Sequence, residues 1–143
     1  MNMSRSRNVN LNRKMDIQRI AEAILQKHGI NPAASGYYLK LQNGHYTDLV
    51  IEKAGCMVLI GHYTRQNGDL ISDPVLAMND DLGLWYPVRI EQWCGDTVCS
   101  SVQEGKRVLY ADRMREFRDF QRMFARNIRV QGWLSAECKR VEG

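Results

Sequence analysis

Apolar residues near the N-terminus recur at the spacing of an amphipathic helix. From Asp16 they are separated by intervals of three and four residues, and the set is Ile17, Ile20, Ala21, Ile24 and Leu25. Asp16 lies in the first turn, where a carboxylate complements the helix dipole. Gly29 follows His28 and can adopt the left-handed conformation that ends helices. The pattern predicts a helix that begins at Asp16 and ends near His28.

A second amphipathic helix is predicted near the C-terminus, from about Asp112 to Gln131. Its apolar stripe has helical spacing, with Met114 and Gln121 at its margin, and consists of Phe117, Phe120, Phe124 and Ile128. Gly132 ends the helix. We expect Trp133 and Leu134, which follow it, to fold back over the rest of the core.

Short runs of β-branched, aromatic and aliphatic residues fill the chain between the helices. The predicted strands are Tyr37–Leu41, Tyr46–Lys53, Cys56–Arg65, Val75–Met78, Trp85–Trp93 and Thr97–Gln103. Turn residues separate them, and Asn43-Gly44 is a strong hairpin signal. Pro87 cannot donate a ladder hydrogen bond, so it is expected at an edge or a bulge. Short strands joined by tight turns predict an α+β fold: an antiparallel meander sheet of about five or six strands, with both terminal helices packed on one face.

Length and charge indicate how the chain is divided into a tail and a domain. The chain has 143 residues, which suits a single domain, and we expect a flexible basic tail over residues 1–14 and one domain over residues 15–143. The tail holds four basic residues and no acid, and it accounts for the whole net charge of +4. The remainder is formally neutral, which argues against a nucleic-acid partner. No apolar run approaches the roughly 20 residues that span a bilayer, so we expect a cytoplasmic protein without a membrane partner.

The cysteines and the known catalytic motifs give no sign of an enzyme. The four cysteines, at 56, 94, 99 and 138, are too few and too irregular for a disulfide scaffold. Cys94 and Cys99 lack the spacing of a zinc knuckle, and no histidine is placed to activate either thiol. Phosphate-binding glycine loops, nucleophile elbows and dinucleotide fingerprints are absent. We therefore expect no cofactor and no metal, and we favour a binding protein over an enzyme.

The densest polar segment of the chain runs from His62 to Pro74. Its candidate site residues are His62, Asn67, Asp69 and Asp73. Carboxylates and an imidazole can hold a divalent metal, which would suit a metal-dependent hydrolase built on Asp69 and Asp73. Turns select the same residue types for backbone reasons, and a structural turn is the favoured interpretation.

Five arginines on the second helix form the most distinctive pattern. They are Arg115, Arg118, Arg122, Arg126 and Arg129, and we call them the arginine face. At about 100° per residue they fall within an arc of roughly 80°, nearly opposite the phenylalanines. Such a face can contact phosphates or an acidic protein surface. The alternative is a solvated face paired with nearby acids, although these cluster near the N-terminal half of the helix.

Aromatic residues are a further candidate. Trp85, Tyr86, Trp93 and the tyrosines at 37, 38, 46 and 63 can in principle stack the bases of a single-stranded nucleic acid. Aromatic side chains also pack twisted sheets against helices, and alternation along a strand sends about half of them to the core face. Packing is the favoured interpretation.

Several segments together resemble an uncharacterised bacterial domain family. They are Gly36–Leu41, Leu49–Glu52, His62-Tyr63, Gln66–Leu70, Asp73-Pro74, Trp85–Val88 and Ala125–Trp133. The resemblance spans about residues 16–134, and the family has no assigned activity. It is found on plasmids, integrative elements and phages, so the resemblance implies an accessory gene of a mobile element. Such genes often encode small proteins that bind host nucleases, defence complexes or DNA.

Three functional hypotheses follow from these observations. The leading one is a small non-enzymatic binding protein of a mobile element that acts on a protein or nucleoprotein partner. The second is direct nucleic-acid binding through the arginine face and the basic tail. The third is a metal-dependent hydrolase that uses Asp69 and Asp73.

Overall fold

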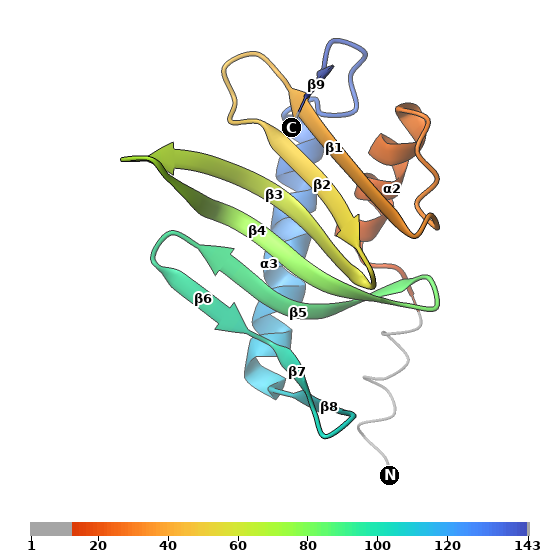
Figure 1. The fold of residues 1–143 in the computed structure, drawn as a ribbon, viewed down its shortest axis with the longest axis vertical. Helices are drawn as coiled ribbons and strands as arrows, with labels where there is room; N and C mark the ends of the chain where they lie inside the picture. The colour runs from red at the N-terminus through yellow and green to blue at the C-terminus, as the bar shows by residue number, and fades with distance from the viewer. Residues whose placement is uncertain (1–12, 143) are drawn as a thin grey trace.

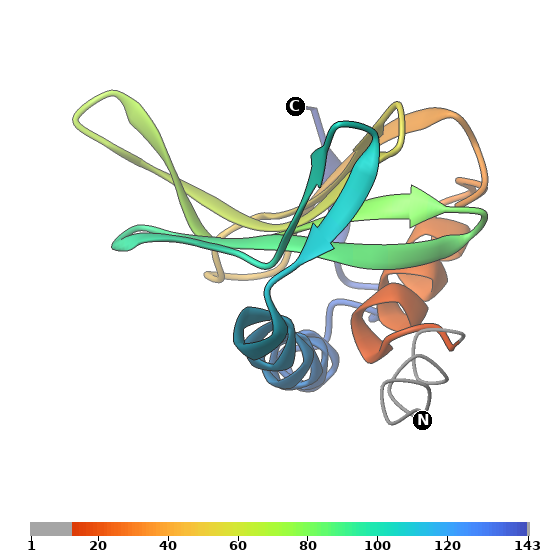
Figure 2. The ribbon, with the colours of Figure 1, turned by 90° about the horizontal axis from the view of Figure 1, so that it is seen from below.

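A seven-stranded antiparallel sheet carries two helices on one of its faces (Figure 1). The computed structural model describes residues 13–142. Helices α2 (Asp16–Lys27) and α3 (Ala111–Val130) lie under the same face of the sheet, and within residues 13–142 the opposite face carries no helix (Figure 2). The predicted α+β fold is confirmed. The predicted tail falls mostly on residues 1–12, which lie outside the described residues.

The main sheet is a meander whose first six strands follow one another in chain order. Their order is β6-β5-β4-β3-β2-β1-β9, so the last strand returns from the C-terminus to pair with the first. The bounds are β1 Gly36–Gln42, β2 Leu49–Ala54, β3 Met57–Gln66, β4 Asp69–Asp81, β5 Leu84–Gln92, β6 Gly95–Val98 and β9 Lys139–Val141. Strands β7 (Ser100–Gln103) and β8 (Lys106–Leu109) form a separate hairpin. The predicted antiparallel meander is therefore confirmed, with more strands than expected.

Two strand predictions were wrong in extent. The segment Thr97–Gln103 is divided between β6, which pairs with β5, and β7, which pairs with β8. Cys99 lies at the junction, where its N–H donates to the Val88 carbonyl at 2.7 Å and its carbonyl accepts the Tyr110 N–H at 3.1 Å. The predicted strand Val75–Met78 is the middle of β4, which has 13 residues. Its N-terminal part is held in the sheet by pairing with the end of β3, so the predicted turn at Asp73-Pro74 lies inside a strand.

The predicted turns and the special position of Pro87 are largely confirmed. Asn67 and Gly68 at the β3–β4 tip have φ of 53° and 87°, as a two-residue hairpin turn requires. The β4–β5 register shifts between Ala77 and Met78, next to Pro87, so this proline lies at a bulge. The connection after Asn43 is longer than predicted, because β2 begins at Leu49 and not at Tyr46.

The core lies between the sheet and the helix pair. Phe117 and Ile128 of α3 are fully buried, Phe124 is nearly so, and Phe120 is half-buried at the edge of the stripe. Trp133 is also fully buried, as expected for a residue that folds back after α3. No helix within residues 13–142 is long and apolar enough to cross a membrane.

Candidate functional site

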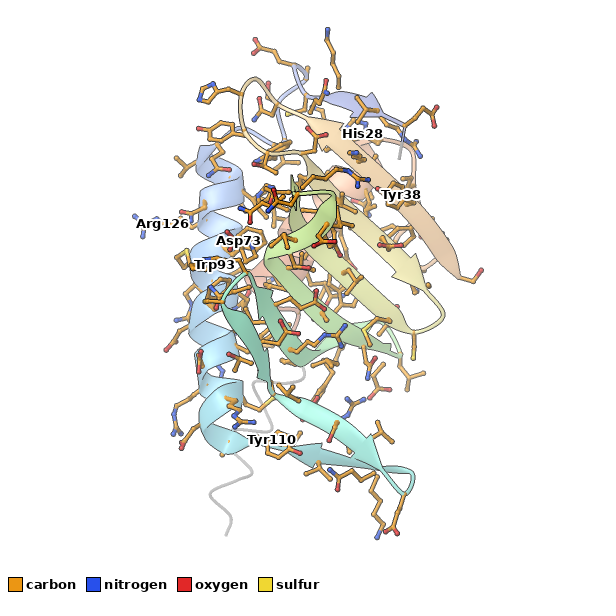
Figure 3. All side chains as sticks on the ribbon, turned by 60° about the vertical axis from the view of Figure 1, so that its left-hand side comes forward. His28, Tyr38, Asp73, Trp93, Tyr110 and Arg126 are labelled. Carbon is orange, nitrogen blue, oxygen red and sulfur yellow. The ribbon has the colours of Figure 1, made fainter. Side chains whose placement is uncertain are left out.

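The arginine face lies on the solvent side of α3, opposite the core. Four of its side chains are exposed, and Arg118 is half-buried. Figure 3 shows Arg126 extending from α3 away from the body of the molecule. The buried positions of Phe117, Phe124 and Ile128 fix this orientation, because residues on opposite sides of a helix cannot both face the sheet.

Acidic neighbours partner the arginine face unevenly. Arg115 pairs with Asp112, and Arg122 Nη1 lies 3.9 Å from Asp119 Oδ1. Both pairs are exposed to solvent, where an ion pair contributes about 0–1 kcal/mol. Among the described residues no carboxylate forms an ion pair with the remaining arginines of the face, which are Arg118, Arg126 and Arg129.

Charge is distributed unevenly between the two helices and the rest of the molecule. We call residues 13–27 and 111–130 the helix layer. Its ten cationic residues are Arg13, Lys14, Arg19, Lys27, Arg113, Arg115, Arg118, Arg122, Arg126 and Arg129. Its five acidic residues are Asp16, Glu22, Asp112, Glu116 and Asp119. The rest of residues 13–142 carries eight basic and eleven acidic residues. The small net charge of residues 13–142, with 18 basic and 16 acidic residues, thus conceals a positive helix layer and a negative remainder.

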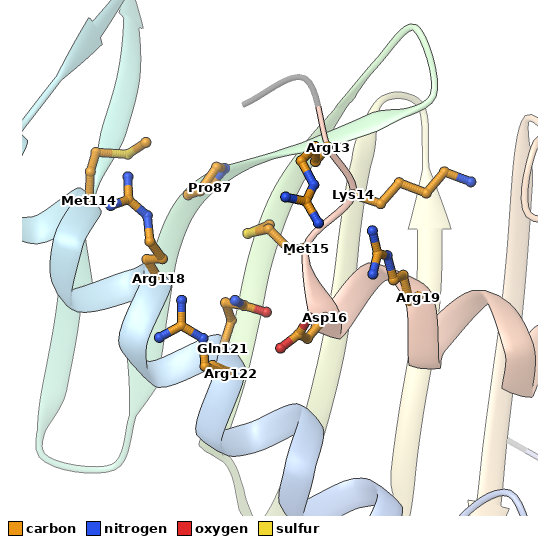
Figure 4. A pocket seen from close by; sticks show the side chains of 10 residues that line it. All are labelled: Arg13, Lys14, Met15, Asp16, Arg19, Pro87, Met114, Arg118, Gln121 and Arg122. Carbon is orange, nitrogen blue, oxygen red and sulfur yellow. The ribbon is translucent and has the colours of Figure 1, made fainter. Parts of the chain in front are cut away.

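A pocket of about 290 Å³ lies in the helix layer, where the segment leading into α2 meets the middle of α3 (Figure 4). Its cationic lining residues are Arg13, Lys14, Arg19, Arg118 and Arg122. The two from α3 belong to the predicted arginine face, whereas Arg13 and Lys14 fall in the predicted tail and no sequence pattern points to Arg19. No local signal connects these residues with α3, because about 100 residues separate them in the chain.

The polar segment from His62 to Pro74 is not drawn together around one point. His62 Nδ1 donates to the Asp48 carbonyl at 3.0 Å, and its ring packs edge-on against Phe124 with centroids 5.7 Å apart. Asn67 lies at the hairpin tip, and Asp69 and Asp73 are exposed on β4. Within residues 13–142 no group of three or more His, Cys, Asp or Glu side chains is placed to hold a metal ion.

The candidate aromatic platform is divided among several places. Trp85 is buried beside α2, Tyr37 is half-buried, and Trp93 is 73% exposed after β5. Tyr38, Tyr46 and Tyr63 line a groove of about 590 Å³. Tyr38 alternates with the buried Leu39 along β1, so this groove opens on the face that carries no helix. Burial raises the pKa of Tyr63 to about 12.

The cysteines differ sharply in burial, and this leads to a prediction. Burial raises the pKa of the Cys99 thiol to about 11 and also raises the pKa of Cys138, whereas Cys56 and Cys94 are exposed. Because the thiolate is the reactive form, a disulfide reagent at pH 8 should modify Cys56 and Cys94 in the native protein. Cys99 and Cys138 should react only after unfolding. Peptide mass spectrometry checks this, and native Cys99 reacting as fast as Cys56 would contradict it.

Comparison with known protein families identifies the family of this chain. A family model described as a domain of unknown function, DUF6908, matches residues 19–134. The chain belongs to the DUF6908 family. This match spans α2 from Arg19 onward, the main sheet through β6, the β7–β8 hairpin and α3. The whole arginine face is therefore part of the DUF6908 domain, whereas Arg13 and Lys14 precede it. No curated protein and no solved structure matches the chain.

Proposed function

We propose that this protein is a non-enzymatic binding protein that docks its helix layer on the phosphate backbone of a nucleic acid. The observation that carries the proposal is the separation of charge, with ten cationic and five acidic residues in the helix layer. The neutral total charge of the folded body argued against such a partner. That argument loses its force because binding depends on the local field of one side, not on the net charge.

The residue types of the arginine face suit this role. Guanidinium groups present paired N–H donors that match the oxygens of a phosphate, and they stay charged at every physiological pH. From Arg115 to Arg129 the face extends over roughly 21 Å of helix, a length that spans several phosphates of a duplex. The association with mobile elements that the resemblance implies forms part of this proposal, since accessory proteins of such elements often act on DNA or on the complexes that handle it.

A second candidate function is docking on an acidic protein surface. It is favoured by two apolar side chains beside the arginine face: Met123 is 45% exposed and Val130 is 78% exposed. They lie in a shallow surface depression with Arg122, Arg126 and Asn127. Arginine and methionine are enriched at protein interfaces and lysine is depleted, and α3 contains no lysine.

We predict that the double variant Arg126→Gln/Arg129→Gln binds a short DNA duplex more weakly than the native full-length chain. Each lost phosphate contact should lower the salt slope of log K by roughly 0.9, so two lost contacts should lower it by about 1.8. The melting temperature should barely change, because exposed charges contribute little to stability. Fluorescence anisotropy at several salt concentrations measures both quantities.

The matched control is Arg65→Gln/Lys106→Gln, which removes the same charge from exposed positions outside the helix layer. This control should bind as the native chain does. Equal losses in the two double variants would show a response to total charge and would count against the arginine face. Absence of duplex and single-strand binding at low salt would reject the nucleic-acid function. Binding of poly-glutamate through Arg126 and Arg129 would then support the acidic-protein candidate.

A further inference from the structure

The pocket of the helix layer has two walls from opposite ends of the chain (Figure 4). One wall is α3, which contributes Arg118, Gln121 and Arg122, and the other includes Arg13 and Asp16 at the start of α2. Met114, Met15 and Pro87 complete the lining with apolar surface. The pocket is therefore a small cleft with cationic groups on both sides and an apolar part between them.

A buried hydrogen bond holds the two walls together. The Gln121 side chain is only 3% exposed, and its Oε1 accepts the Ile17 N–H at 2.9 Å. Met15, the N-cap residue of α2, makes no side-chain cap bond, so a residue of α3 supplies what the local sequence does not. This bond between the helices fixes the position of the α2 N-terminus relative to Arg118 and Arg122. The pocket is thus formed in advance of any ligand.

The positive charge of the pocket is poorly compensated. Lys14 pairs with Glu22 at 2.8 Å, and Figure 4 shows its side chain extending away from α3. Arg122 has the 3.9 Å contact with Asp119. In the described part of the chain, Arg13, Arg19 and Arg118 take part in no ion pair. Asp16 is the one carboxylate among the lining residues.

We propose that this pocket binds a phosphoryl group. Guanidinium forks on both sides match the oxygens of a tetrahedral anion, and the N-terminal end of α2 adds partial positive charge. A volume of about 290 Å³ leaves room for a phosphate or a pyrophosphate. The inference rests partly on the proposed function, since Arg118 and Arg122 belong to the arginine face, and it goes further because residues of the α2 segment complete the site. The phosphoryl group comes either from a nucleic-acid backbone or from a free phosphate compound.

The test titrates the full-length chain with pyrophosphate by calorimetry. The native chain should bind it saturably, and the pocket variant Arg19→Gln/Arg118→Gln should bind at least about tenfold more weakly, as expected when charge-assisted hydrogen bonds are lost. Asp16→Asn removes the opposing carboxylate and should strengthen binding severalfold. Arg126→Gln/Arg129→Gln changes the arginine face outside the pocket and should leave pyrophosphate affinity within about twofold.

Each outcome decides for or against the pocket independently of the proposed function. Saturable binding that weakens in the pocket variant and strengthens in Asp16→Asn supports it. If the pocket variant does not fold, the test uses the other two variants: pyrophosphate affinity should rise in Asp16→Asn and stay unchanged in Arg126→Gln/Arg129→Gln. If pyrophosphate binding does not saturate up to about 10 mM, the proposed phosphoryl site is wrong. It is also wrong if Arg126→Gln/Arg129→Gln weakens pyrophosphate binding as much as the pocket variant does. Duplex binding through Arg126 and Arg129 is tested separately by the salt titration. Where pyrophosphate binds, displacement by duplex identifies a backbone phosphate, and no displacement identifies a free phosphate compound.

Discussion

Replacing Phe124 with alanine should lower the free energy of unfolding by about 3–5 kcal/mol. The ring is 4% exposed and lies between α3 and the sheet, 5.7 Å from the His62 ring and 6.3 Å from the Phe120 ring, centroid to centroid. The His62 ring also packs on Trp133, with centroids 5.8 Å apart, so the aromatic neighbours of Phe124 are themselves held in place. Because they cannot collapse fully into the vacated space, the variant bears the cost of a cavity in addition to the lost burial. Urea denaturation measures the change.

The matched control for Phe124 is its neighbour in sequence, Met123. This side chain is on the solvent side of the same helix, so Met123→Ala should change stability by no more than about 0.5 kcal/mol. Similar losses in the two variants would contradict the burial of the phenylalanine stripe. A loss confined to Phe124 would also confirm in solution that the arginine face points away from the core, because the stripe and the face share one helix.

The helices could be predicted because their signal is local. In α2, the apolar spacing from Ile17 and the left-handed residue Gly29 after the last turn mark both ends within the segment itself. The tip between β3 and β4 is similar, since Asn67-Gly68 meets the backbone needs of a two-residue turn without help from elsewhere. These elements depend on neighbouring residues, and the sequence therefore contains all that is needed to find them.

The elements that the sequence did not reveal are those defined by a distant partner. Strand β9 is short and mostly polar, and it is a strand because Lys139–Val141 pairs with Lys40–Gln42. The first part of β4 resembles a turn, yet cross-strand bonds to β3 extend it. The division between β6 and β7 likewise depends on distant partners, because Cys99 bonds to Val88 through its N–H and to Tyr110 through its carbonyl. Periodicity within one segment cannot report such pairings.

The candidate site divides in the same way. The arginine face could be predicted because it is the opposite side of the phenylalanine stripe, and one helical period fixes both. The pocket could not, because Arg19 and Arg118 line the same cleft only through the packing of α2 on α3, which the Gln121 bond to Ile17 secures. Net charge was misleading for a related reason. The net charge says nothing about where the charges lie, whereas the fold brings ten of the 18 cations of residues 13–142 together in the helix layer.

The variant Gly61→Ala should be among the most destabilising single substitutions in the chain, with a loss of about 3 kcal/mol or more. A Cβ at this position would lie 2.2 Å from the Pro74 carbonyl oxygen and 2.5 Å from the Val75 Cα. Both obstacles belong to the backbone of β4, so no side-chain rotation relieves the clash. Strand β4 is held between β3 and β5, and moving it away from Gly61 would break pairings on both of its edges.

The matched control for Gly61 is Gly36, at the start of β1. Its nearest contact for an added Cβ is the Lys53 carbonyl oxygen at 3.5 Å, an ordinary van der Waals distance. Gly36→Ala should therefore be neutral or stabilising by up to about 1 kcal/mol, because alanine restricts the unfolded chain more than glycine does. Urea denaturation of both variants separates a steric requirement at Gly61 from a general effect of removing glycine from a strand. Equal stabilities would mean that β3 and β4 do not approach each other closely at Gly61.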